Sequence, residues 1–236
     1  MNYQIITNKH KLEDFINWLP ELQPNEKYYL SLFARKKYVT NDIAKYILKP
    51  LTSDKCQLKR FTSDKARLLS KIKQLEVPLG SYMQGNLEIP QEALALYITV
   101  NPRNMYKATI NTMVKLAESI RDNNVIMNPH QEALSEIQKS KGTTHYVDFD
   151  IDESNEEKLP SIIEEIKLYV NEDAVTWLKT RGGMHVLINV SKINDKYRKT
   201  YFRDIAAMNG IDQKGDLLIP VVGTYQGGYT PTFVEC

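Results

Sequence analysis

Cysteine and histidine are scarce in this chain, which has only two cysteines and four histidines among 236 residues. Two cysteines, Cys56 and Cys236, do not suffice for a disulfide framework and favour a reducing compartment. The scattered histidines and cysteines offer no zinc-finger spacing. No stretch approaches the roughly 20 apolar residues that a membrane-spanning helix needs, and we expect no signal peptide. We therefore expect a cytoplasmic protein with no membrane partner.

Charges of both signs are abundant but unevenly distributed. The formal net charge is only +2, yet residues 1–145 carry many lysines and arginines, whereas residues 148–173 are strongly acidic. A basic first half beside an acidic centre suits a protein that binds a polyanion and concentrates metal at one point. A solvated surface of mixed charge is the alternative interpretation.

The periodicity of apolar residues predicts alternating helices and strands. Helices are expected at 10–19, about 40–48, 63–75, 104–121, about 156–170 and about 194–208. Strands are expected at 28–34, 96–100, 146–152, 174–180, 184–190 and 216–220. In the helix at 104–121, the side chains expected on the inner side are Met105, Ala108, Met113, Leu116 and Ile120.

The element order across residues 146–222 is strand–helix–strand–strand–helix–strand, which is the outline of a palm or RNA-recognition-like (RRM-like) fold. We therefore predict an α/β (α+β) fold in a single domain over residues 1–236. Within it, we expect an N-terminal α/β module (1–140) interlocked with a palm/RRM-like mixed sheet (141–236). A cleft between the two modules would hold the functional site.

Aspartates alternate with aromatic and β-branched residues in the segment Tyr146–Asp152. A period of two places Asp148, Asp150 and Asp152 on one face of a strand. Carboxylates this close raise one another's pKa unless a cation lies among them. A divalent metal explains the cluster, and all-oxygen ligation favours Mg²⁺ or Mn²⁺. The alternative is a charged sheet edge that blocks aggregation, although edge protection favours lysine and needs no such cluster.

A glycine-rich turn follows the next predicted strand, in the segment Thr180–His185. Two consecutive glycines, Gly182 and Gly183, let backbone N–H groups approach an anion closely. Arg181 adds a guanidinium fork that suits phosphate, and His185 starts the following strand, where its imidazole could donate to a phosphate oxygen. Each feature alone is common in hairpins. Together with an acidic strand about 35 residues upstream, they indicate phosphate binding beside a metal.

Three short motifs in this order resemble those of a known family. Val147-Asp148-Phe149-Asp150, Gly183-Met184-His185 and Gly215-Asp216 are similar to the ordered motifs of the archaeo-eukaryotic primase superfamily, which includes primase-polymerases. The segment 220–228 resembles the Pro-Gly-Thr-x-Gln segments of some plasmid and phage members, and the segment 33–38 resembles their N-terminal basic strand end. The resemblance spans about residues 28–230. It implies template-directed nucleotidyl transfer by a DNA primase or primase-polymerase.

The resemblance implies a two-metal site that uses Mg²⁺ or Mn²⁺. Asp148 and Asp150 would ligate the metals, and Asp216 would be the third catalytic carboxylate. Gly215 precedes Asp216 where the family carries an apolar residue. Asp212, which follows Ile211, fits that local pattern better and remains an alternative third ligand.

The resemblance also implies two sets of binding residues. The incoming nucleotide would be contacted by His185, Arg181, Thr180, Gly182 and Gly183, with Gly183 standing where the family carries serine. Nucleic acid would be contacted by Arg35, Lys36, Lys37, Arg103 and Gln226. In the alternative interpretation, the basic side chains are simply solvated and Gln226 lies in an ordinary turn.

The expected partners are a DNA template and primer, nucleoside triphosphates, and a separate helicase or replication protein in a bacterial, plasmid or phage replication context. Two other functions stay open. One is a catalytically degenerate, primase-like module that only binds nucleic acid, because Gly183 and the third acid depart from the family pattern. The other is a metal-dependent nucleotide-sugar glycosyltransferase, although that activity would not call for the Gly-x-His hairpin or the basic first half.

Overall fold

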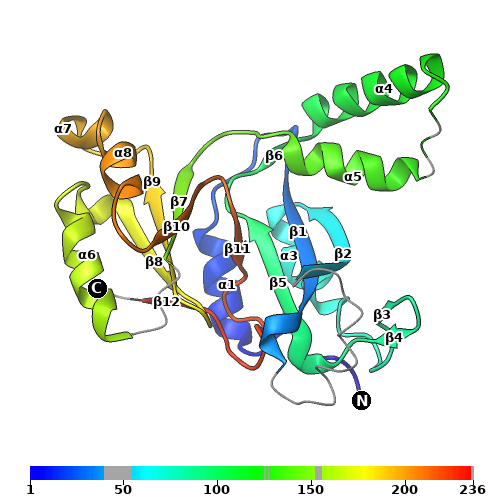
Figure 1. Ribbon diagram of the computed structural model, residues 1–236, viewed down its shortest axis with the longest axis horizontal. Coiled ribbons are helices and arrows are strands. Elements are labelled where there is room, and N and C mark those ends of the chain that lie inside the picture. The colour runs from blue at the N-terminus through cyan, green and yellow to red at the C-terminus, as the bar shows by residue number, and fades with distance from the viewer. Residues whose placement is uncertain (40–54, 125, 127, 152–155, 235–236) are drawn as a thin grey trace.

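The computed structural model describes residues 1–39, 55–124, 126, 128–151 and 156–234. It contains helices, two five-stranded sheets and a two-stranded hairpin, so the predicted mixture of helix and strand is confirmed (Figure 1). The helix predicted at about 40–48 and the side chain of Asp152 lie outside the described residues. Among the described residues, no helix has both the length and the apolar composition needed to cross a bilayer.

The first sheet combines strands from distant parts of the sequence. Its strands, in spatial order, are β11 (Leu218–Pro220), β5 (Leu94–Thr99), β1 (Glu26–Arg35) and β2 (Lys55–Ser63), and β6 (Arg103–Asn104) also pairs with β1. All these pairs are antiparallel. Because side chains alternate along a strand, Leu30 and Leu32 point into the core, whereas Ser31 and Arg35 belong to the opposite face.

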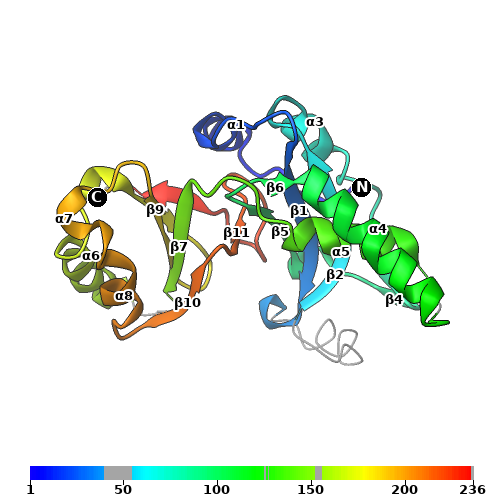
Figure 2. The same ribbon diagram turned by 90° about the horizontal axis from the view of Figure 1, so that it is seen from above.

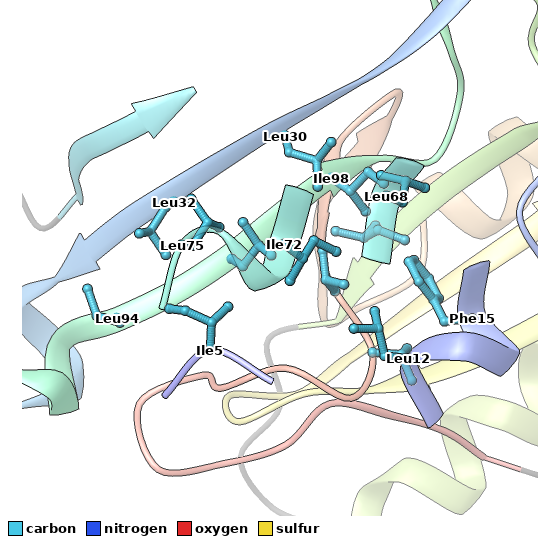
Figure 3. Packing of buried hydrophobic residues seen from close by; sticks show 14 of the residues in the cluster. Ile5, Leu12, Phe15, Leu30, Leu32, Leu68, Ile72, Leu75, Leu94 and Ile98 are labelled. Carbon is cyan, nitrogen blue, oxygen red and sulfur yellow. The ribbon is translucent and has the colours of Figure 1, made fainter. Parts of the chain in front are cut away.

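Two helices cover the apolar face of the first sheet. They are α1 (Lys9–Trp18) and α3 (Leu68–Lys73), and their leucine, isoleucine and phenylalanine side chains pack against those of β1 and β5 (Figure 3). Helix α1 begins at Asn8, whose side chain accepts a hydrogen bond from the Lys11 amide at 3.0 Å, as an N-cap residue does. The helix predicted at 63–75 is shorter, because β2 continues to Ser63 and the chain then forms a turn before Leu68.

The second sheet has the predicted strand–helix–strand–strand–helix order up to residue 208, but its next strand, at residues 211–215, was not predicted. The strand predicted at 216–220 is β11, which belongs to the first sheet. Its strands, in spatial order, are β10 (Ile211–Gly215), β7 (Tyr146–Ile151), β9 (Met184–Asn189), β8 (Val175–Lys179) and β12 (Thr232–Val234). Helix α6 (Leu159–Lys167) connects β7 to β8. The helix predicted at about 194–208 is divided into α7 (Asp195–Arg198) and α8 (Tyr201–Ala206). These helices cover one face of the sheet, where Phe149, Val186 and Ile166 form a second core.

The opposite face of the second sheet changes from apolar to polar along its strands. At one end, Tyr146 and Leu187 join the core of the first sheet, and the ring of Tyr146 lies 4.8 Å from that of Trp18 in α1. The next side chains on the same face are polar, because Asp148 is two residues beyond Tyr146 and His185 is two residues before Leu187. The contact between the sheets is therefore apolar at one end and polar at the other.

The helix predicted at 104–121 is present as α4 (Met105–Arg121), but its predicted inner side is only partly correct. Ala108 is buried, whereas Met113 and Ile120 are 65% and 77% exposed. The cause is that α4 projects from the sheets and pairs with α5 (Pro129–Lys139), a helix absent from the sequence prediction (Figures 1 and 2). An apolar period locates one face of a helix but does not show whether anything covers it.

The remaining elements are short and lie in connections. They are the hairpin of β3 (Met83–Gln84) and β4 (Leu87–Glu88) and the single 3₁₀ turns η1 (Lys36–Tyr38), η2 (Lys65–Arg67), η3 (Gln91–Ala93), η4 (Glu156–Lys158) and η5 (Glu172–Ala174).

Replacing Leu187 with alanine tests the apolar contact between the two sheets. Leu187 is fully buried, so we expect the free energy of unfolding in urea to fall by about 2–5 kcal/mol. Leu168→Ala is the control, because Leu168 is 69% exposed and its loss should change stability by no more than about 0.5 kcal/mol. Equal effects of the two substitutions would show that the sheets do not depend on this contact.

Candidate active site

The register of β7 and β9 brings three predicted site residues together. Asp150 is directly opposite His185, and Asp148 is opposite Leu187. The imidazole of His185 lies between the two carboxylates: Nδ1 is 3.0 and 3.1 Å from the carboxylate oxygens of Asp148, and Nε2 is 3.7 Å from Oδ1 of Asp150. The residues that the sequence placed in separate motifs thus form one cluster.

Burial sets the electrostatics of this cluster. Asp148 has no exposed surface, and His185 is only 7% exposed. Burial alone lowers the pKa of His185, but the neighbouring carboxylates of Asp148 and then Asp150 oppose this effect, and the net pKa is raised above its ordinary value. The carboxylate of Asp148, which water does not reach, therefore favours the protonated form of His185.

A pocket of about 390 Å³ opens beside the cluster. The second sheet and its hairpin contribute Asp150, His185, Thr180 and Gly182 to its lining. The other walls are rich in basic side chains, which are Arg35, Lys37, Lys55, Arg103, Lys139 and Lys141. The site thus has an acidic corner and basic walls, an arrangement that attracts anions while leaving a position for a cation.

Sequence analysis found only part of this basic lining. Arg35, Lys37 and Arg103, which were predicted to contact nucleic acid, line the pocket, whereas Lys36 is not among the lining residues. Lys139 and Lys141 were missed, because they lie at and just beyond the end of α5, which was not predicted. Lys55 was missed because β2, where it pairs with Arg35 across the sheet, was not predicted either.

Asp216, the predicted third carboxylate, lines the same pocket but has its own partners. It follows the end of β10, forms an ion pair with Arg103, and accepts a hydrogen bond from Nδ2 of Asn101 at 3.1 Å. Nδ2 of Asn101 also donates to the carbonyl of Tyr146 at 2.7 Å, and this fixes the start of β7. Asp216 therefore ties the end of β5 to the second sheet. The side chain of the alternative ligand, Asp212, lies outside the described residues.

The side chains of Arg181 and Gln226 hold the Gly182–Gly183 turn in place. The guanidinium of Arg181 donates to the carbonyl of Tyr38 at 2.9 Å and lies 4.8 Å from the centre of its ring. Arg181 is not among the pocket-lining residues, and its amide donates to Oε1 of Gln226 at 3.0 Å. The guanidinium, which was predicted to bind phosphate, and the amide of the same residue are thus both engaged within the protein.

A buried polar network missed by sequence analysis lies behind this turn. Nε2 of Gln226 donates to the hydroxyl of Tyr38 at 2.9 Å, which is 3.2 Å from that of Tyr97. The Tyr97 hydroxyl also accepts from Arg35 at 2.7 Å. Burial raises the pKa of Tyr97, so its hydroxyl keeps its proton. Gly227 completes the arrangement, because a Cβ there would come within 2.6 Å of Tyr38.

The donor set at the acidic corner suits a hard divalent cation. Asp148 and Asp150 supply carboxylate oxygens, which Mg²⁺ and Mn²⁺ prefer, and a buried carboxylate such as Asp148 needs a nearby positive charge. Within the part of the chain that the structure describes, however, no group of three or more histidine, cysteine, aspartate or glutamate side chains is arranged to hold a metal ion. The fit therefore rests on two adjacent carboxylates.

The His185–Asp148 contact predicts a pH dependence of stability. Because the folded pKa of His185 lies above its unfolded value of about 6.5, the stabilisation is complete below that pH and is lost as the pH rises through the folded pKa. We expect the free energy of unfolding of the wild type to exceed that of His185→Gln, with the largest difference at pH 6 and the smallest at pH 9. Both are measured by urea unfolding in the presence of a chelator. His10→Gln, at a side chain that is 86% exposed, should show no such trend. A difference that grows with pH would contradict the assignment.

The Arg103–Asp216 pair predicts strong coupling between two buried charges. The two side chains are 4% and 9% exposed, so Arg103→Met or Asp216→Asn alone should cost about 3–5 kcal/mol by leaving one charge unpaired. The double variant should lose much less than the sum. The exposed pair Arg121–Asp122 is the control, worth about 0–1 kcal/mol. Additive losses at Arg103 and Asp216 would show that the charges do not depend on each other.

The site therefore consists of the carboxylates of Asp148 and Asp150, a histidine with a raised pKa between them, and a pocket with basic walls beside them. Comparisons with protein-family models, with curated proteins and with solved structures found no match.

Proposed function

We propose that this protein catalyses template-directed nucleotidyl transfer, as a DNA primase or primase-polymerase. The observation that carries the proposal is the cluster of Asp148, Asp150 and His185 at the acidic corner of a basic pocket. A nucleoside triphosphate with its metal ions presents the complementary charges. The pocket is then the active cleft between an N-terminal α/β module and a palm-like module.

Asp148 and Asp150 would hold Mg²⁺ or Mn²⁺ in this function. When bound, the metal ions would activate the primer 3′-hydroxyl and neutralise the triphosphate during in-line displacement. Asp148 is fully buried, so its position is fixed by the surrounding sheet, whereas Asp150 lines the open pocket. An ion held by Asp148 would have to replace the contact of its carboxylate with His185, whereas Asp150 already faces the pocket.

His185 would act on the triphosphate as a donor. Its Nδ1 faces Asp148, which leaves Nε2 as the ring atom available to a ligand. Because the raised pKa keeps both ring nitrogens protonated over a wider pH range, Nε2–H can donate to a phosphate oxygen. Thr180 and Gly182, which line the pocket beside it, would limit where that phosphate lies.

The basic walls would hold the remaining negative charge of the nucleotide and the template. Lys37, Lys55, Lys139 and Lys141 come from β1–η1, β2 and the end of α5, so they surround the pocket from several directions. Phosphate contacts of this kind supply sequence-independent affinity and position the nucleic acid. This arrangement fits a template and primer as partners, together with a replication protein such as a helicase.

One observation favours a second candidate, a primase-like module that binds nucleic acid without catalysis. Asp216 is paired with Arg103 and Asn101, so the third carboxylate is engaged elsewhere. The basic pocket would still bind a polyanion in that case. A glycosyltransferase is less well supported, because a nucleotide sugar requires neither the histidine between two carboxylates nor basic walls from three elements.

Incorporation of labelled nucleotides on a primed template tests the proposal. We expect incorporation that depends on Mg²⁺ or Mn²⁺ and falls by about 100-fold or more in Asp148→Ala, since one preorganised charge is worth that much in many active sites. The control is Asp195→Ala, which removes a carboxylate that is 97% exposed on α7.

The alternatives give different results in the same assay. DNA binding without incorporation under either metal would favour the non-catalytic module. Preferential binding of a nucleotide sugar over a nucleoside triphosphate would favour the glycosyltransferase. Full activity of Asp148→Ala would contradict the proposed site.

A further inference from the structure

Helix α4 carries an apolar stripe on its outer side that no described part of the chain covers. Its large members are exposed to fractions of 70% (Tyr106), 42% (Ile110), 65% (Met113), 51% (Val114) and 77% (Ile120). Ala117, which lies between them along the helix, is exposed as well. At about 3.6 residues per turn, these positions fall on one face and extend over most of the helix.

The inner side of α4 is already occupied by α5. Ala108 is buried there, and Lys115 forms ion pairs with Glu132 and Glu136 of α5. Both views show the two helices paired at one end of the molecule, with α4 projecting away from the sheets (Figures 1 and 2). A contiguous apolar patch of this kind on an outer surface marks a contact with another molecule.

We infer that the apolar stripe of α4 is a dimer interface in which it packs antiparallel against α4 of a second copy. A two-fold axis near Met113 would set Tyr106 of one copy against Ile120 of the other. Ile110 would lie against Ala117, whose small side chain leaves room for it, and Met113 would lie near its own equivalent. Five of the six apolar positions of the stripe thus meet an apolar position, in pairs related by the two-fold axis, as in an isologous interface.

The charges beside the stripe select this orientation. Lys107 and Glu118 are both exposed and flank the same side of the stripe at its two ends. In the antiparallel pair, Lys107 of each copy lies beside Glu118 of the other, which gives two attractive contacts. A parallel pair would instead place this flank of each helix against the opposite flank of the other and lose both attractive contacts. Arg121 pairs with Asp122 and also attracts Glu118 within the same helix, in the parallel and the antiparallel arrangement alike.

Sedimentation of the whole chain over a range of concentrations tests the inference. A single helix pair is smaller than a standard interface, so we expect dimerisation at about micromolar concentrations. Met113→Glu should abolish it by placing two carboxylates at the two-fold axis. Leu168→Glu is the control, because Leu168 is 69% exposed but lies beyond the end of α6. Thermal unfolding of each variant checks that the fold is intact.

Charge-reversal variants test the orientation of the dimer without changing any apolar residue of the stripe. Lys107→Glu and Glu118→Lys should each weaken self-association by about tenfold, since two weak attractions become repulsions. An equimolar mixture of the two variants should associate as tightly as the wild type, because every cross-contact in the mixed dimer is attractive. A chain that carries both Lys107→Glu and Glu118→Lys should likewise self-associate as tightly as the wild type.

The outcomes distinguish a dimer interface on the stripe from a binding site for a different protein. A wild type that stays monomeric at about 100 µM, far above the expected micromolar range, would overturn the inference and leave the stripe to a different protein. A dimer that is unaffected by Met113→Glu, or a mixture that does not recover, would place the contact elsewhere. The inference does not rest on the proposed function, and nucleotide incorporation need not change in any of these variants.

Discussion

The structure depends on one shared surface, the face of β7 and β9 that lies against the first sheet. Its apolar end is packed between α1 and the first sheet through Tyr146 and Leu187. The same strands continue rigidly toward the pocket, so Asp148 is held at full burial only two residues beyond Tyr146. The core that stabilises the fold thereby also immobilises the carboxylate and leaves His185 as its charge partner. Folding and the preparation of the site are consequences of the same packing.

A second set of contacts fixes the glycine turn relative to the first sheet. Tyr38 is central to it, because its hydroxyl, its ring and its carbonyl contact Gln226, Arg181 and Tyr97. Such a network is stabilising only when every buried polar group finds a partner. This explains why the conspicuous arginine of the turn supports its geometry, while Thr180 and Gly182 are the turn residues that reach the pocket.

The sequence predicted the parts of the site that arise from local periodicity. Asp148 and Asp150 share a face because a strand alternates, and His185 follows from a hairpin signal with a short connection. The partners of Asp216 could not be predicted, because Arg103 is 113 residues away in the sequence. The pairing depends on where the chain leads after the end of β10. Lys139 and Lys141 were missed with α5, whose apolar positions are few. Met113 and Ile120 of α4, which are exposed, were assigned to the inner side because periodicity carries no information about what lies opposite.

The position of β11 has a consequence for the order in which the protein can be assembled. This strand pairs with β5, and the segment after it adds bridges from Gln226 to Ala95 and from Thr224 to Ile6. The edge of the first sheet at β5 therefore stays unpaired until residues 218–226 have left the ribosome. Contacts between such distant residues slow folding and expose strand edges meanwhile. The first sheet therefore reaches its full width only after β7, β8 and β9 of the second sheet have been synthesised.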